Sequence, residues 1–274
     1  MDKIFTGVKI SAIATALPKE KLVLSTLGEK FGAEAVRKII KSTEISELSV
    51  TPDGKTSADY CIEAARKIFS SGIVEPAEID GVIFVTETPN YILPHTSAEL
   101  QATLGVPNHA LTLDINYGCA GYVYGLFVAS LLVESGYCRN VLFCAGDSIT
   151  KKVSTEDKAT RMVLGDGCSA TILTAAKNSA PSIFAFHTEG ENLDKLVIPA
   201  GAFKTPHKPG VTDVWSYDEN GNGHTLEDVH MDGMGVMNFV MKSVRALVAE
   251  TLGALNLSLD AVDLFAMHQA NALI

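Results

Sequence analysis

The sequence predicts an α/β fold in which helices cover both faces of a mostly parallel sheet. Apolar runs of strand length alternate along the chain with segments whose apolar residues recur at helical spacing. The runs at 80–86 and 140–146 are apolar almost throughout, which is typical of strands that are buried on both sides. Buried strands that alternate with helices in this way are characteristic of α/β proteins.

The first part of the chain carries most of these elements. The expected strands lie at 8–14, 80–86, 110–115, 140–146 and 168–176, and the expected helices at 57–71, at 96–104 and from Cys119 to about Glu134. The helix at 57–71 has one apolar face, made of Ala58, Cys61, Ile62, Ala65 and Ile68. The helix at 96–104 should end at Gly105, because glycine commonly follows the last turn of a helix.

In the second part of the chain, strands and helices alternate again after a turn at 177–181. We expect strands at 183–188 and 262–267 and a helix at 235–253, whose apolar positions recur at the spacing of a core-facing helix. Residues 199–225 are dense in glycine, proline, asparagine and histidine and predict a long loop. The sequence therefore predicts two halves, residues 1–176 and residues 177–274.

Composition excludes several classes of protein. The formal net charge of −10, without a basic stripe, argues against nucleic-acid binding. The N-terminus lacks the basic and apolar regions of a secretion signal, and the run at 120–133 is too short to span a membrane. The five cysteines include no CxxC pair, which indicates neither a disulfide framework nor a zinc site and suits a reducing compartment. We expect a cytoplasmic protein that does not bind a membrane.

Cofactor and metal motifs are also missing from the sequence. There is no GxGxxG, no phosphate-binding GxxxxGK[ST] and no HExxH. We therefore expect neither a resident cofactor nor a metal ion.

One stretch, Asp114-Ile-Asn-Tyr-Gly-Cys-Ala-Gly121, indicates covalent catalysis. It places Cys119 at the junction of a predicted strand and a predicted helix. The free N–H groups and the positive end of a helix favour the thiolate, which is the nucleophilic form of cysteine. The small residues Gly118, Ala120 and Gly121 on either side would let a substrate reach the sulfur. A buried core cysteine is the structural alternative.

Three motifs occur together in a specific order: the cysteine elbow, the turn Leu164-Gly-Asp-Gly-Cys168, and His268-Gln-Ala-Asn271 at the end of a predicted strand. In this combination the chain resembles the thiolase-like condensing enzymes, and most closely β-ketoacyl-acyl-carrier-protein synthase III. The resemblance covers essentially the whole chain. It implies a thiolase-like fold, in which two similar halves place their sheets around buried helices, and a homodimer as the working unit.

The resemblance also implies roles for individual residues. Cys119 would accept an acyl group from a thioester, and His268 would donate a hydrogen bond to the carbonyl of the malonyl extender as it decarboxylates. Asn271 would support the histidine. Leu93 would reach into the acyl pocket of the partner subunit. The substrates would be acyl thioesters of coenzyme A or of an acyl carrier protein, with Lys158, Arg161 and Lys242 as contacts: all three are cationic.

The sequence departs from the family pattern in two respects. Family members have a further catalytic asparagine and a glycine-rich loop after the histidine, whereas this sequence ends at Ile274. We therefore expect a C-terminally truncated second half and an inactive or impaired form of the enzyme. The tryptophan and arginine that contact coenzyme A in family members are absent near residues 41–45, and Lys158 aligns with a further arginine of the family. These differences favour a specialised homologue.

Three alternatives stay open at this stage. Glu87 follows a predicted strand and matches the general base of the related hydroxymethylglutaryl-CoA synthases, which condense without decarboxylation. A second alternative is simple acyl transfer from a thioester to an oxygen or nitrogen acceptor. The third is a non-catalytic subunit that pairs with an active paralogue.

Overall fold

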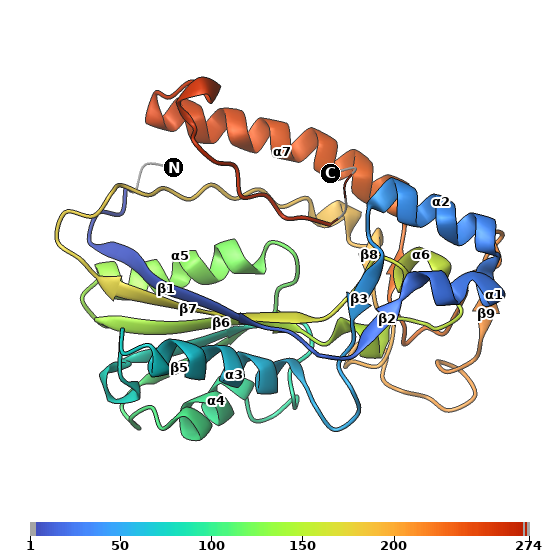
Figure 1. Ribbon diagram of the computed structural model, residues 1–274, viewed down its shortest axis with the longest axis horizontal. Coiled ribbons are helices and arrows are strands. Elements are labelled where there is room, and N and C mark those ends of the chain that lie inside the picture. Colours follow the sequence, from blue (N-terminus) through green and yellow to red (C-terminus); the bar gives the residue numbers. More distant parts are fainter. Residues whose placement is uncertain (1–3, 271, 273–274) are drawn as a thin grey trace. The chain divides into compact units, whose positions relative to one another are not determined.

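The computed structural model describes residues 4–270 and 272 of the chain (Figure 1). The chain forms two compact units, each assembled from three separate segments. The first unit contains Met1–Glu20, Ser49–Ser148 and Asp166–Phe184. The second contains Lys21–Leu48, Ile149–Gly165 and Ala185–Ile274. The division into halves at residues 176 and 177 stays a prediction.

A five-stranded sheet with the order β1-β7-β6-β4-β5 forms the centre of the first unit. Its strands are β1 (Val8–Ala16), β4 (Gly81–Val85), β5 (Leu111–Ile115), β6 (Asn140–Asp147) and β7 (Gly167–Ala175). All five lie where the sequence predicts strands, to within two residues at each end.

The sheet is mostly parallel, as expected, because β1, β4, β5 and β6 run in one direction and β7 runs in the other. β4 runs parallel to β5 and β6, but β7 runs antiparallel to both β6 and β1. The chain leaves β6 through two short helical segments, η3 (Ile149–Lys152) and α6 (Lys158–Arg161). Parallel pairing normally uses a long crossover helix that packs on the sheet, and no such helix connects β6 with β7.

Helices cover both faces of this sheet (Figure 1). α3 (Ser57–Ser70) and α4 (Thr96–Leu104) lie on one face, and α5 (Gly121–Glu134) lies on the other. Because successive strand residues point to opposite faces, Phe84 packs in the cluster with α3 and α4 while Ile83 packs in the cluster with α5. A short helix, η2 (Pro76–Glu78), precedes β4.

The boundaries of these helices follow from local sequence signals. Thr56 and Asp59 form a capping box at the start of α3, in which the backbone N–H of Thr56 donates to Asp59 Oδ2 at 2.8 Å. α4 ends as expected at Gly105, whose φ of +72° lies in the left-handed region that glycine adopts without strain.

The second unit consists mainly of helices and two-stranded sheets. Its helices are η1 (Leu24–Leu27), α1 (Gly28–Phe31), α2 (Ala33–Thr43), η3, α6, η4 (Gly190–Asn192), α7 (Gly233–Leu255) and η5 (Leu259–Ala261). Its strand pairs are β2 (Lys21–Val23) with β3 (Glu47–Ser49), β8 (Leu196–Val197) with β11 (His230–Met231), and β9 (Ser216–Tyr217) with β10 (Gly223–His224). A small core of Leu24, Val36, Leu48 and Met162 holds α2 in place.

Two predictions for the second part of the chain are wrong. Residues 183–188 and 262–267 form no strands, and the only β-bridge next to them in the described part of the chain joins Phe5 to Ser182. An apolar run becomes a strand only where a neighbouring strand completes its hydrogen bonds, and neither segment has such a neighbour among the described residues.

The helix predicted at 235–253 is confirmed as α7, but its expected core face is not buried. None of its residues is buried, and the side chain of Phe239 is 38% exposed. None of the helices in the described part of the chain has the length and apolar content needed to cross a bilayer.

Candidate functional site

Cys119 lies at the elbow between β5 and α5, as the sequence predicts. It is the one exposed cysteine of the five, since Cys61, Cys138, Cys144 and Cys168 are all buried. An exposed thiol at a strand-to-helix turn is accessible to a substrate.

The glycines beside Cys119 have a packing role that the sequence alone does not show. A Cβ atom added to Gly118 would lie 2.3 Å from Glu87 Oε2, and one added to Gly121 would lie 2.4 Å from Val85 Cγ1. Both distances are far below van der Waals contact. A side chain at Gly121 would overlap Val85 of β4, and a side chain at Gly118 would displace the carboxylate of Glu87.

Glu87 is therefore a neighbour of the cysteine elbow. It follows the end of β4, and its carboxylate occupies the space directly above the backbone of Gly118. The sequence offers Glu87 as the general base of an alternative reaction, and the structure brings it beside Gly118, the residue that precedes the predicted nucleophile.

Asp147, at the end of β6, is a residue of this site that the sequence analysis missed. Its Oδ1 atom accepts hydrogen bonds from Thr86 Oγ1 at 2.8 Å, the Glu87 N–H at 2.7 Å, the Thr88 N–H at 3.1 Å and Thr88 Oγ1 at 3.0 Å. A signal for it was present, because an acidic residue follows an apolar strand that runs parallel to β4. The carboxyl ends of parallel strands meet at the same edge of a sheet.

The electrostatics of the elbow differ from expectation. Desolvation raises the pKa of the Cys119 thiol, and the Glu87 and Asp147 carboxylates raise it further, against a smaller lowering by a backbone hydrogen bond. Desolvation and the charge of Asp147 also raise the pKa of Glu87. Desolvation and the two carboxylates together therefore favour the thiol form of Cys119.

Apart from Leu93, the other predicted site residues belong to the second unit. His268 belongs to the second unit, where it is exposed in an irregular segment after η5. Asn271 lies outside the described residues. Leu93 belongs to the loop between β4 and α4 and is 85% exposed, beside the exposed Tyr91 and Ile92.

The predicted cationic contacts lie in the second unit and have interactions there. Lys158 Nζ donates to the carbonyl oxygen of Asn220 at 2.9 Å, and Lys242 Nζ forms an ion pair with Glu189 Oε1 at 3.2 Å. Arg161 occupies the last position of α6.

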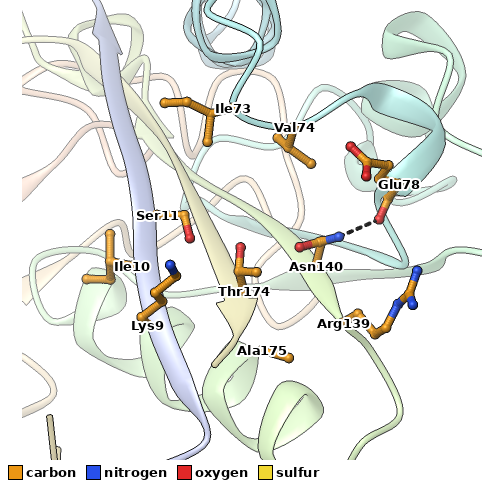
Figure 2. Close-up of a pocket in the computed structure, with 10 residues that line it drawn as sticks. All are labelled: Lys9, Ile10, Ser11, Ile73, Val74, Glu78, Arg139, Asn140, Thr174 and Ala175. Atoms are coloured by element: carbon orange, nitrogen blue, oxygen red, sulfur yellow. Dashed lines mark hydrogen bonds between the residues drawn. The ribbon is translucent and has the colours of Figure 1, made fainter. Parts of the chain in front are cut away.

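Figure 2 shows a cavity of the first unit, with a volume of about 600 Å³. Its lining includes Lys9 and Ser11 of β1, Asn140 at the start of β6 and Thr174 near the end of β7. Because Cys119 follows the carboxyl end of β5, this cavity contains none of the predicted site residues. Within residues 4–270 and 272, no three His, Cys, Asp or Glu side chains are arranged to hold a metal ion.

Comparisons with known proteins agree on one family. Residues 113–191 match the family model described as 3-oxoacyl-[acyl-carrier-protein] synthase III. A β-ketoacyl-[acyl-carrier-protein] synthase III of Nitratidesulfovibrio vulgaris is 31% identical over 243 residues, which cover 89% of this chain and 70% of that protein.

Solved structures give the same result. A crystal structure of a 3-oxoacyl-(acyl-carrier-protein) synthase III matches with a TM-score of 0.94 and 36% identity, over 97% of this chain and 80% of that one. The 3-oxoacyl-(acyl-carrier protein) synthase of Burkholderia xenovorans matches with a TM-score of 0.91 and 31% identity, over 99% of this chain and 76% of that one.

Proposed function

The chain belongs to the β-ketoacyl-acyl-carrier-protein synthase III family of condensing acyltransferases. We propose that it joins an acyl thioester to a malonyl thioester through an acyl group carried on Cys119. Its similarity to solved members of the family over nearly the whole chain confirms the predicted thiolase-like fold. The observation that carries the assignment of the nucleophile is that Cys119, alone among the cysteines, is exposed, and that it lies at the strand-to-helix elbow.

The reaction proceeds in two steps. The thiolate of Cys119 attacks the carbonyl carbon of the donor thioester, a new carbon–sulfur bond forms, and the donor thiol leaves with a proton. The malonyl thioester then loses carbon dioxide, and the electron pair of the broken bond forms an enolate. This enolate attacks the acyl carbon, and the bond to Cys119 breaks to release the β-ketoacyl thioester and the cysteine.

His268 is proposed to donate a hydrogen bond to the thioester oxygen of the enolate, with Asn271 as its support. A donor directed at the oxygen where charge develops is worth about 2.7–4 kcal/mol of transition-state stabilisation. The proposal for both residues rests on the His-Gln-Ala-Asn motif and on membership of the family.

Acylation of Cys119 tests the first step directly. The protein is incubated with acetyl, butyryl and octanoyl thioesters of coenzyme A and of an acyl carrier protein, and its intact mass is measured. We expect the mass of one acyl group on the peptide that contains Cys119, and none in the Cys119→Ala variant. An acyl group of unchanged mass and yield on that variant would remove Cys119 as the nucleophile.

Release of labelled carbon dioxide from malonyl thioester tests the second step. We expect release to depend on prior acylation of Cys119 and to fall by about 100-fold or more in His268→Ala, because the lost donor acts in the transition state. Acyl transfer without carbon dioxide release would instead favour transfer to an oxygen or nitrogen acceptor.

We propose that the acyl carrier protein named for the relatives is also a substrate partner here, in fatty-acid biosynthesis in the cytoplasm. Lys158, Arg161 and Lys242 are the cationic side chains proposed to contact the anionic carrier or the phosphates of coenzyme A. No resident cofactor or metal ion is part of this proposal, and neither is binding to nucleic acid or to a membrane.

A homodimer is the proposed working unit. β5 ends the sheet of the first unit and pairs only with β4, so one of its edges is unpaired within that unit. The exposed apolar residues Tyr91, Ile92 and Leu93 lie in the loop after β4. Leu93 is proposed to enter the acyl pocket of the partner subunit. Light scattering should therefore give twice the mass of the chain, and Leu93→Phe should change the preferred length of the acyl donor.

A second candidate function is condensation without decarboxylation, with Glu87 as the general base. The observation that favours it is the place of the Glu87 carboxylate above Gly118, together with its raised pKa. In this reaction an acetyl thioester would lose a proton to Glu87 and attack the acyl carbon. Product formed from acetyl thioester alone, and lost in Glu87→Gln, would support it, whereas strict dependence on malonyl thioester would exclude it.

A further inference from the structure

Asp147 connects two parts of the first unit at the cysteine elbow. It is the last residue of β6, while its hydrogen-bond donors, Thr86, Glu87 and Thr88, form the loop that leaves β4. Four donors from three consecutive residues converge on a single carboxylate oxygen, and hydrogen bonds to a charged acceptor are stronger than those between neutral groups.

Other contacts make this arrangement rigid. The Thr88 N–H also donates to Thr86 Oγ1 at 3.0 Å, and the Ser148 N–H donates back to Thr88 Oγ1 at 2.9 Å. The Thr86 N–H donates to the carbonyl oxygen of Ile115 in β5, which extends the parallel ladder by one residue. The backbone of Glu87 is therefore held on both sides.

This anchoring fixes the backbone from which the Glu87 side chain extends. With its N–H directed to Asp147, Glu87 places its carboxylate against the face of Gly118 from which any side chain would exclude it. Two carboxylates, Glu87 and Asp147, are the charged groups that act on the Cys119 sulfur, and Asp147 is the charged group that acts on Glu87.

We propose that Asp147 is a positioning residue, which seats Glu87 over Gly118 and thereby fixes the negative charge that Cys119 faces. The inference rests on the proposed function in that Cys119 is taken as the nucleophile. It concerns how readily Cys119 loses its proton rather than which acyl group it carries. By keeping the Glu87 carboxylate over Gly118, the residue before Cys119, Asp147 favours the thiol form of Cys119.

Two substitutions of Asp147 separate the effect of its charge on Cys119 from its effect on the position of Glu87. Asp147→Asn removes the charge but keeps an oxygen that can accept the same hydrogen bonds. Asp147→Ala removes both the charge and the oxygen, so Glu87 is released. Each is made alone and in combination with Glu87→Gln, and the rate of Cys119 alkylation by iodoacetamide is followed against pH by mass spectrometry. This readout needs no turnover.

The expected result is an ordered series of titration midpoints. The midpoint should fall to lower pH in Asp147→Asn and further in Asp147→Ala, because the second change also lets the Glu87 carboxylate leave the elbow. In the Glu87→Gln background the two Asp147 variants should have the same midpoint, since no carboxylate remains to be positioned. The alkylation rate at neutral pH should rise several-fold in step with the thiolate fraction.

Two outcomes would overturn the proposal. In the first, the alkylation midpoints of Asp147→Ala and Asp147→Asn differ by the same amount with and without Glu87. In the second, the two midpoints are indistinguishable in the native background. Asp114→Asn is the matched control: Asp114 accepts the N–H groups of Thr96 and Ser97 at 2.6 and 2.8 Å and is not among the charges that act on Cys119. Its midpoint should equal that of the native protein.

A second variant keeps the test decisive if Asp147→Ala does not fold. Thr88→Val removes one hydroxyl donor to Asp147 and leaves every charge in place. It should lower the midpoint in the native background and leave it unchanged in Glu87→Gln, with folding checked by circular dichroism. Acylation by donor thioesters is measured separately, so that failure of the proposed function can be told from failure of this inference.

Discussion

The two units of the molecule differ in whether the apolar residues of their helices are buried. In the first unit, α3, α4 and α5 all contribute buried residues to cores on the two faces of one sheet. In the second unit, the 23 residues of α7 include none that is buried, although their apolar spacing is equally regular. The periodicity of apolar residues therefore predicts where a helix forms, whereas burial of that helix depends on a surface for it to pack against.

The largest expected difference concerns the two cores. Phe143 of β6 is fully buried against α5, whereas Phe239 of α7 is 38% exposed. Phe143→Ala should lower the free energy of unfolding by about 3–5 kcal/mol, because it leaves a cavity. Phe239→Ala should cost about 1 kcal/mol or less. Urea denaturation of the two variants measures both values, and similar losses would contradict the comparison.

Glycine substitutions should have opposite signs in the two units. A Cβ at Gly121 would overlap Val85, so Gly121→Ala should destabilise the protein by about 1–3 kcal/mol. Gly253 lies within α7 and has nothing within 4 Å of an added Cβ. Gly253→Ala should therefore stabilise the protein by roughly 0.5–1 kcal/mol. Thermal unfolding followed by circular dichroism at 222 nm would show whether the signs differ.

Helix capping offers a smaller contrast. Asp114 accepts the N–H groups of both Thr96 and Ser97 at the start of α4, so Asp114→Ala should cost about 1–2 kcal/mol. Asp232 accepts the Gly235 N–H at 2.9 Å at the start of α7, in an exposed position. Asp232→Ala should have the weaker effect in the same urea experiment, and an equal effect would show that α7 is held more firmly than its burial indicates.

The smallest expected effects depend on pH and have opposite signs. The folded state raises the pKa of Glu87 through desolvation and Asp147, so its ionisation opposes folding as pH rises above the ordinary glutamate value of about 4.3. Glu87→Gln should therefore stabilise the protein at neutral pH, and this gain should vanish below about pH 4.

Asp232 behaves in the reverse way. The hydrogen bond from the Gly235 N–H lowers the pKa of Asp232, so its contribution is present above the ordinary aspartate value of about 3.9 and is lost as pH falls through the lower folded value. Asp232→Asn should destabilise the protein at neutral pH but not in strong acid. Urea midpoints measured from pH 2 to pH 7 would test both signs.

The sequence predicts those helices and strands whose signals lie within a short stretch of the chain. The five strands of the main sheet, the helices α3, α4, α5 and α7, and the place of Cys119 at an elbow all follow from apolar runs, spacing and glycine positions. The direction of β7 did not follow, because it depends on how the chain returns after β6. The run at 262–267 was read as a strand, although an apolar run does not reveal whether a neighbouring strand is present.

The place of Cys119 at a strand-to-helix elbow follows from the sequence, but the electrostatics around it do not. Cys119 and Glu87 were identified from motifs, and Asp147 was not, although it follows an apolar strand in the same way. The expected lowering of the pKa of Cys119 by the helix is wrong, because the pKa is raised first by desolvation and then by the carboxylates that the parallel strands bring to the same edge.

The pairing of β1 with β7 has a consequence for how the chain acquires its shape during synthesis. Val8 of β1 pairs with Ala175 of β7. At ordinary rates of translation, β7 therefore leaves the ribosome on the order of ten seconds after β1, and β1 cannot pair before then. Contacts between such distant segments make folding slow. Until β7 emerges, the nascent β1 presents an unpaired ladder of N–H and C=O groups, which makes it a natural binding segment for a chaperone.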